Sequence, residues 1–133
     1  MKAVFVDTSF FLASLNPSDE LHNKAIAASR EINALRLTTA FILLEVANSM
    51  SGSGQRANFV NFYEQLRVHP HARIVPVSED IFQRGYGLYA DRKDKDWSLT
   101  DCISFVVMSD ESLTEALTYD HHFEQAGFGA LLR

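Results

Sequence analysis

A continuous apolar segment rich in β-branched residues opens the chain and restricts the folds that it can adopt. Residues 3–6 read AVFV, without the polar alternation of a strand that has one face in water. Such a segment is typical of a parallel strand that helices cover on both faces. Asp7 ends it, and the helical spacing of Phe10, Phe11 and Leu15 follows at once. We therefore expect a strand that leads directly into a helix.

The same succession of strand and helix signals continues along the chain. Further short strands are predicted at 37–39, 73–77, 116–119 and 129–132. Helical spacing occupies the intervals, at 8–16, 18–35, 40–50, 55–68, 79–92, 98–111 and 121–128. Strands that alternate with helices indicate an α/β fold with a short, mostly parallel β-sheet flanked by helices. A length of 133 residues suits one domain, residues 1–133, with one core.

Several of these helices have recognisable start signals. Ser18 is predicted to cap the helix at 18–35, and Ser78 the helix at 79–92. The helix at 40–50 is apolar almost all round, which indicates burial. Phe123 is predicted to anchor the last helical turn in the core.

Composition narrows the function classes. The single cysteine, Cys102, excludes an intramolecular disulfide and a cysteine-rich zinc site, and a cytoplasmic location is expected. No stretch approaches the ~20 apolar residues of a membrane helix, so no membrane partner is expected. The formal net charge of −5 counts against a nucleic-acid partner, unless several carboxylates are sequestered around a cation.

Two aspartates are placed where sites form in parallel sheets. Asp7 and Asp120 each follow a predicted strand, and sites of such sheets gather at the carboxyl ends of strands. The two side chains are therefore expected to meet at one edge. Each aspartate can instead cap the helix that follows it, and this alternative stays open.

Two further acids stand in apolar helices. Glu45 lies within FILLEVAN, where a lone buried carboxylate is costly unless it is paired or bound to a metal. Pairing with Arg36 or Arg73 is the structural alternative. Asp101 lies in the first turn of an otherwise apolar helix, three residues after Ser98, which is an acidic version of the capping-box spacing.

The four acids are more informative together than singly. Converging carboxylates repel one another, and a divalent cation removes that repulsion. Hard oxygen ligands without cysteine indicate Mg²⁺ or Mn²⁺ rather than structural zinc. Such ions bind a scissile phosphate and neutralise a leaving oxyanion. Subtracting four site carboxylates takes the net charge of −5 to about −1, so the remaining surface need not repel a polyanion.

Four sequence blocks occur in an order that spans nearly the whole chain: VDTSFFLA, LLEVANSM, WSLTDCISFVVM and ALTYDHHFEQAGF. In this order they resemble PIN-domain nucleases, in particular single-domain ribonuclease toxins of the VapC type. The resemblance implies a PIN-like three-layer sandwich and hydrolysis of RNA phosphodiester bonds with Mg²⁺ or Mn²⁺. By position it assigns the catalytic and metal-binding roles to four acids: Asp7, Glu45, Asp101 and Asp120.

Weaker candidates for substrate binding accompany these acids. Ser9 matches the small polar position after the first aspartate of the family, where it would hold water or phosphate. Thr8 and Ser98 are further candidates, as is Asn48, one turn after the helical glutamate and on roughly the same face. Asp96 is interpreted first as part of a solvated loop and only second as a further acid of the site.

The resemblance also implies partners. VapC-type chains pair with a small antitoxin protein that plugs the acidic pocket, and the substrate is RNA; a homodimer stays open. A housekeeping PIN-domain RNA-processing nuclease and a non-catalytic RNA- or partner-binding PIN fold are the alternatives. A receiver-type signalling module is disfavoured, because Asp7 has no adjacent acid and no lysine follows the late strand.

The triplet Asp120-His121-His122 admits two interpretations. A histidine metal motif is one of them, and the letters DHH occur literally in a phosphoesterase family. That family needs further motifs and a longer chain, and neither is visible. We therefore interpret Asp120 as the last acid of the pocket and the histidines as residues that a hard-metal site does not need. Contact of one histidine with a substrate phosphate or a nearby water stays open.

A polar loop before the Asp101 helix is harder to interpret. Arg92, Lys93 and Lys95 precede Trp97 near the predicted metal edge. A solvated loop with interleaved aspartates is the first interpretation, and steering of phosphates is the second. Trp97 is expected to pack in the core rather than to stack on a base.

Overall fold

Five strands form one sheet, in which every pair of neighbours is parallel. The computed structural model describes residues 2–133, and the strand order is β3-β2-β1-β4-β5. The strands are β1 (Ala3–Val6), β2 (Leu35–Thr39), β3 (Ala72–Val75), β4 (Glu115–Leu117) and β5 (Gly129–Ala130). The predicted α/β class with a short parallel sheet is therefore confirmed.

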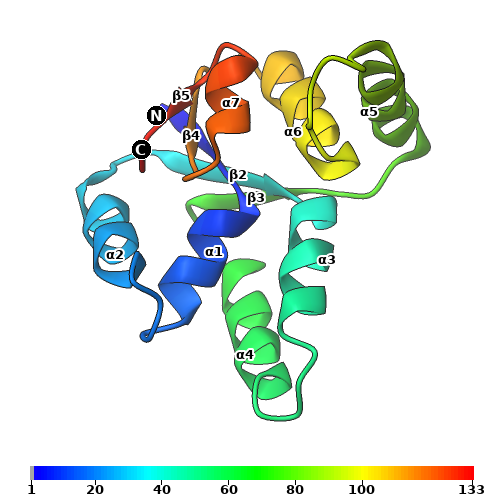
Figure 1. The fold of residues 1–133 in the computed structure, drawn as a ribbon. Helices are drawn as coiled ribbons and strands as arrows, with labels where there is room; N and C mark the ends of the chain where they lie inside the picture. The colour runs from blue at the N-terminus through cyan, green and yellow to red at the C-terminus, as the bar shows by residue number, and fades with distance from the viewer. Residues whose placement is uncertain (1) are drawn as a thin grey trace.

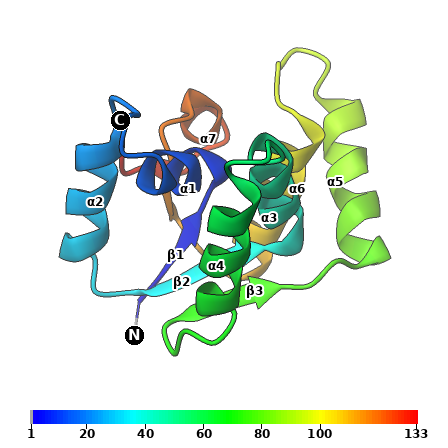
Figure 2. The ribbon, with the colours of Figure 1, turned by 90° about the horizontal axis from the view of Figure 1, so that it is seen from below.

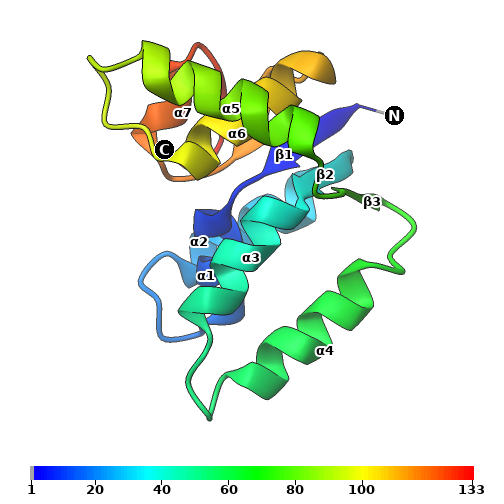
Figure 3. The ribbon, with the colours of Figure 1, turned by 90° about the vertical axis from the view of Figure 1, so that its right-hand side faces the viewer.

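Helices cover both faces of this sheet (Figures 1 and 3). One layer holds α1 (Thr8–Leu15), α2 (His22–Glu31), α3 (Ala40–Ser49) and α4 (Arg56–Leu66). The other holds α5 (Glu79–Asp91), α6 (Leu99–Asp110) and α7 (His121–Gln125). Figure 2 shows the first layer from below, with α4 crossing in front of β2. The predicted three-layer arrangement is thus present.

The core lies on both faces of β1, as the apolar segment predicts. Val4, Phe5 and Val6 are all buried. Phe123 of α7 is fully buried as well and lies 6.1 Å from Phe5 and 5.0 Å from Phe105, measured between ring centroids. Burial of such a ring stabilises the fold by about 1.5–3 kcal/mol. The predicted anchoring of α7 through Phe123 is confirmed.

The order in which successive strands are added to the sheet changes direction at β1. From β1 the chain adds β2 and then β3 on one side, and it returns to place β4 and β5 on the other. The backbone N–H of Asp7 donates to the carbonyl of Leu117 at 3.2 Å, which joins the carboxyl ends of β1 and β4. Ligands of open parallel sheets bind at such a switch point. The topology therefore places Asp7 beside the segment that leads to Asp120.

Three local predictions are wrong. Ser18 does not cap α2, which begins only at His22; the side chains of Asn16 and Asp19 accept backbone N–H groups and hold residues 16–21 in turns instead. The third strand ends at Val75, just before Pro76, rather than at residue 77. The helix at 40–50 is not buried all round, because Leu44 remains 59% exposed.

The cap predicted at Ser78 is confirmed, since its hydroxyl accepts the N–H of Ile81 at 3.1 Å. Among the helices of the described chain, none has the length and apolar character needed to cross a membrane.

Candidate active site

A pocket of about 350 Å³ lies at the carboxyl ends of β1 and β4. All four predicted acids line it: Asp7, Glu45, Asp101 and Asp120. Three of the weaker candidates, Thr8, Ser9 and Ser98, line it as well. The structure thus brings together residues that are far apart in the sequence. The three aspartates lie at the starts of α1, α6 and α7, and Glu45 lies inside α3.

Asp7 is the most buried of these acids, at 5% exposure. It occupies the N-cap position of α1, yet its side chain makes no cap hydrogen bond, so the capping alternative is wrong for this residue. Its Oδ2 accepts hydrogen bonds from Ser9 Oγ at 3.0 Å and Thr118 Oγ1 at 2.8 Å. The pKa of Asp7 is raised to about 6, chiefly by burial and in smaller part by the nearby charge of Asp101, against the lowering effect of these two bonds.

Two hydroxyls hold this carboxylate in place. Thr118 is fully buried, donates to Asp7 and accepts the backbone N–H of Asp120 at 3.0 Å, so that it connects the two strand ends. Ser9 donates to Asp7 and accepts the N–H of Tyr119 at 3.1 Å. Ser9 therefore positions a carboxylate, whereas the sequence suggested contact with water or phosphate. The sequence does not single out Thr118 as a residue of the site. The feature that points to it is a hydroxyl side chain at the end of an apolar strand, two residues before Asp120.

Glu45 enters the pocket from α3. Thr8 Oγ1 donates to its Oε1 at 2.5 Å. Arg36 instead donates to α2, and Arg73 forms an ion pair with Glu111 at 3.0 Å. Neither arginine pairs with Glu45, so the structural alternative for this acid is wrong.

Asp101 caps its helix and also faces the pocket. Its backbone N–H donates to Ser98 Oγ at 3.0 Å, and the backbone N–H of Ser98 donates to Asp101 Oδ2 at 3.1 Å, which completes the predicted capping box. The same carboxylate lines the pocket. Burial raises the pKa of Asp101, hydrogen bonds from Ser98 and His122 oppose the rise, and the charge of Asp120 adds to it.

Asp120 also caps a helix, because its Oδ1 accepts the N–H of His122 at 2.9 Å. The same turn brings the His122 ring to 3.0 Å from Asp101 Oδ2 and 3.3 Å from Asp120 Oδ1, measured from Nδ1. His122 lines the pocket between these two acids, so it is the one of the two histidines that is placed to contact the site. The sequence feature that indicates this placement of His122 is its position two residues after the N-cap Asp120, where the helical turn brings the side chain toward the cap.

The two remaining candidates, Asp96 and Asn48, differ in their relation to the pocket. Asp96 is exposed in its loop, as its first interpretation states, but it also lines the pocket. Asn48 is exposed and is not among the residues that line it.

The chemistry of the pocket fits a hard divalent cation. Within residues 2–133, no lysine or arginine forms an ion pair with Asp7, Glu45, Asp101 or Asp120. The buried negative charge therefore has no fixed counter-charge, apart from the His122 ring if it is protonated. Carboxylate oxygens are the ligands that Mg²⁺ and Mn²⁺ prefer.

A second group of possible metal-binding side chains lies beside the acidic pocket. Ligand atoms of Asp120, His121 and His122 lie within 4.8 Å of one another. These residues are consecutive, so one helical turn suffices to bring them together. The His121 side chain is 55% exposed, and the Nδ1 of His122 already faces two carboxylates. The acidic pocket is therefore the better candidate for a cation.

Comparison with known proteins agrees with this geometry. The chain is 26% identical over 126 residues to the 23S rRNA-specific endonuclease VapC20 of Mycobacterium tuberculosis, an alignment that covers 94% of this chain and 95% of that protein. The crystal structure of VapC20, described as a Sarcin-Ricin loop cleaving toxin, superposes with a TM-score of 0.86 at 25% identity. That superposition covers 94% of this chain and 95% of VapC20.

A more distant structure shares the fold. VapBC2 from Rickettsia felis, bound to a DNA fragment from its promoter, superposes with a TM-score of 0.67 at 11% identity, over 96% of each chain. A sequence model of the PIN domain matches residues 4–129, which include part or all of every strand of the sheet and every residue of the acidic pocket. This chain therefore belongs to the PIN-domain family.

Proposed function

We propose that this chain is an endoribonuclease that hydrolyses RNA phosphodiester bonds with the help of Mg²⁺ or Mn²⁺. One observation carries the proposal: four acids without a lysine or arginine partner among the described residues converge at the switch point of a PIN sheet. In this proposal the catalytic residues and metal ligands are Asp7, Glu45, Asp101 and Asp120. Burial raises the pKa of Asp7 and of Asp101, and a cation bound beside these two carboxylates would take the place of the protons that burial favours.

The chain's own residues divide the work of the reaction. When bound, a divalent ion would supply charge to stabilise the scissile phosphate and its leaving oxygen. Thr118 and Ser9 fix the orientation of the Asp7 carboxylate, and Thr8 fixes that of Glu45. A carboxylate oxygen that accepts a hydrogen bond from the attacking water would orient it for in-line attack.

The substrate class and the partner follow by similarity. VapC20 is named for cleavage of 23S rRNA and its sarcin–ricin loop. We infer that this chain also cuts RNA, at a loop rather than within a duplex, and that it is the toxin of a VapBC-type pair. An antitoxin protein would then cover the acidic pocket. A housekeeping RNA-processing nuclease remains the second candidate, because the same pocket serves either role.

Cleavage assays on purified protein test the nuclease. Wild type should cleave an RNA panel in Mg²⁺ or Mn²⁺ and stop when a chelator is added. Asp7→Asn and Asp101→Asn should each lower the rate about 100-fold or more, because each removes a charge from the cation site. Glu20→Gln changes an exposed acid outside the pocket and serves as the matched control. Equal rates for wild type and both aspartate variants would assign the cleavage to another protein.

Brief expression in a bacterial host tests the toxin. Wild type should arrest growth and produce new RNA 5′ ends, and Asp7→Asn should do neither. Normal growth together with metal-dependent cleavage in vitro would favour the housekeeping nuclease.

A further inference from the structure

A second hollow adjoins the acidic pocket and differs from it in character. Its volume is about 810 Å³, and Asp96 and Ser98 line both hollows, so the two lie side by side. We call it the tyrosine–lysine groove, after four of the residues that line it: Tyr86, Tyr89, Lys93 and Lys95.

The two tyrosines present aromatic surface to solvent. Tyr86 is 52% exposed and Tyr89 is 49% exposed. They stand three residues apart on α5 and therefore share one face of the helix. Exposed rings of this kind stack on unpaired bases, and they do so with little preference for sequence.

The lysines supply positive charge where the chain as a whole is negative. Lys93 and Lys95 form no ion pair within the described chain, whereas the neighbouring Arg92 is bound to Asp94 at 2.9 Å. Most other arginines are likewise held by carboxylates. The Lys95 ammonium lies 6.0 Å from the centroid of the Trp97 ring, and Asp96 places one carboxylate in the same groove. Two ammonium groups without a carboxylate partner, beside exposed rings, match the alternating phosphates and bases of a single strand.

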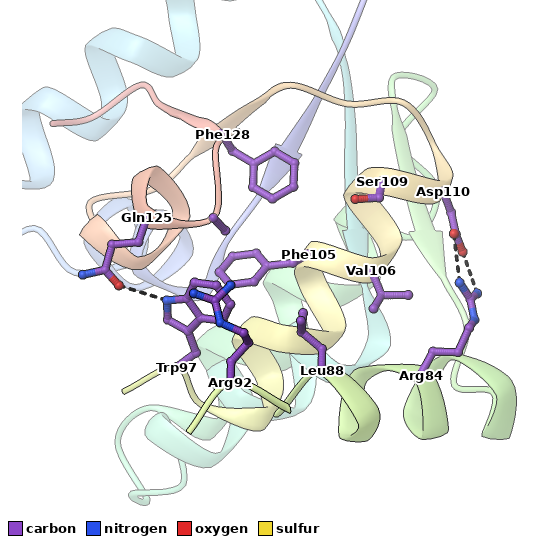
Figure 4. Close-up of a pocket in the computed structure, with 11 residues that line it drawn as sticks. Arg84, Leu88, Arg92, Trp97, Phe105, Val106, Ser109, Asp110, Gln125 and Phe128 are labelled. Atoms are coloured by element: carbon purple, nitrogen blue, oxygen red, sulfur yellow. Dashed lines mark hydrogen bonds and ion pairs between the residues drawn. The ribbon is translucent and has the colours of Figure 1, made fainter. Parts of the chain in front are cut away.

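The loop that carries the lysines ends at Trp97, whose neighbours Phe105, Gln125 and Arg92 are drawn in Figure 4. Trp97 is buried, packs edge-on against Phe105 at 5.1 Å and donates from Nε1 to Gln125 at 3.0 Å. On its other face lies the Arg92 guanidinium, 4.9 Å from the ring centroid. Trp97 therefore holds the loop at its end, directly before Ser98 and α6. Such anchoring reduces the entropy lost when a ligand binds.

From this arrangement we propose that the tyrosine–lysine groove binds the unpaired stretch of the RNA substrate next to the bond that is cut. Bases stack on Tyr86 and Tyr89, and the intervening phosphates bind Lys93 and Lys95. This inference rests on the proposed ribonuclease function. A second copy of the chain is the competing occupant. Its net charge of −5 attracts the lysines less strongly than the dense negative charge of an RNA backbone does.

Enzyme kinetics with paired variants test the groove. The probe is an end-labelled, unpaired RNA of about 20 nucleotides, longer than the site of one such module. Tyr86→Leu combined with Tyr89→Leu should raise KM about 30-fold or more and leave kcat little changed, because stacking on two rings is lost. The combination Tyr86→Phe and Tyr89→Phe keeps the rings and should behave as wild type. Phe82→Leu alters an exposed aromatic of α5 outside the groove and is the matched control.

Salt dependence tests the lysines separately. Lys93→Gln with Lys95→Gln should make the slope of log affinity against log salt shallower by about 0.7 per lysine, as expected for phosphate contacts to a single strand. Arg30→Gln removes an exposed cation of α2 and should leave the slope unchanged.

The outcomes separate this inference from the function on which it rests. If wild type cleaves RNA and the leucine variants match it in KM, the groove is refuted and the ribonuclease stands. If wild type neither binds nor cleaves the RNA panel, both proposals fail. If Phe82→Leu acts as strongly as the tyrosine variants and sedimentation shows that a dimer is lost, a second copy covers this face, and the RNA groove is refuted.

Discussion

Asp7 combines burial, charge and a fixed orientation in one side chain. Its carboxylate is removed from water and raised in pKa to about 6, yet two hydroxyls hold it in one geometry. The folded chain therefore maintains an acid that is unfavourable in the metal-free state. Binding sites commonly retain such a cost in folding stability, because a ligand that neutralises the buried charge restores the lost free energy of folding.

The first prediction concerns the stability of Asp7→Asn without metal. Because the folded-state pKa lies above the ordinary 3.8, the contribution of Asp7 to stability is full below about pH 3.8 and is lost as pH rises through about 6. Asparagine removes this loss, so the variant should unfold with a free energy about 1–3 kcal/mol higher than wild type at pH 7.5. Denaturant titrations in chelator measure the difference. It should shrink at pH 4.5, and a difference independent of pH would contradict the pKa assignment.

The second prediction separates the two adjacent histidines. His122 contacts two pocket acids, whereas His121 is exposed. His122→Ala should lower metal-dependent cleavage about 10-fold, the size typical of residues that orient metal ligands. His121→Ala is the matched control and should leave the rate unchanged. Asp120→Asn should cost far more than either, and the reverse ranking would return the histidines to the role of metal ligands.

Residues of the site differ in how well the sequence predicts them. The four acids are predictable because a carboxylate after an apolar strand, or inside an apolar helix, conflicts with its surroundings. Thr118 and His122 are not, because a threonine or histidine is compatible with many environments. Their roles depend on the turn between β4 and α7, whose geometry becomes visible only in three dimensions.

Among the elements, the contact between α5 and α6 is the most sensitive to the size of one residue. Gly85 is buried in α5, and a Cβ placed there would lie 2.4 Å from Ile103 Cγ1 and 3.0 Å from Ile103 Cα. The second of these atoms belongs to the backbone, which cannot turn aside. Glycine therefore allows the two helices to approach closely.

The third prediction compares two glycines of α5. Gly85→Ala should force the helices apart and lower the free energy of unfolding by about 1–3 kcal/mol, the usual cost of overpacking. Gly87→Ala meets no atom within 4 Å and should raise it by about 0.5–1 kcal/mol through helix propensity. Thermal unfolding of both variants measures the contrast. Equal effects would mean that α5 does not pack as closely as described.

Helices and strands were predictable to different degrees. Strand β1 is predicted with its observed bounds, because a strand covered on both faces accommodates an unbroken apolar run, of which Val4, Phe5 and Val6 are buried. The start of α2 is not, because Asn16 and Asp19 compete with Ser18 for the same backbone groups. Capping signals identify the residues able to end a helix, but tertiary packing selects among them.

At the scale of the whole molecule, metal binding and folding are linked. The fourth prediction is that Mn²⁺ raises the melting temperature of wild type, because only the folded chain brings the four acids together. The increase should grow from pH 5 to pH 7.5, since a pKa of about 6 at Asp7 makes protons compete with the cation below that value. Differential scanning fluorimetry measures it. Asp7→Asn with Asp101→Asn should remove most of the increase, and an unchanged increase would place the ion elsewhere.

The order of strands along the chain has a consequence for the timing of activity. Asp7 follows the first strand, but its partner Thr118 and the acid Asp120 come only with the fourth. During synthesis, the ribosome thus releases the first acid long before the residues that complete the pocket. We expect a nascent chain that ends before residue 115 to be unable to cut RNA. A nuclease with this topology stays inert beside the ribosome that makes it until almost all of its fold has emerged.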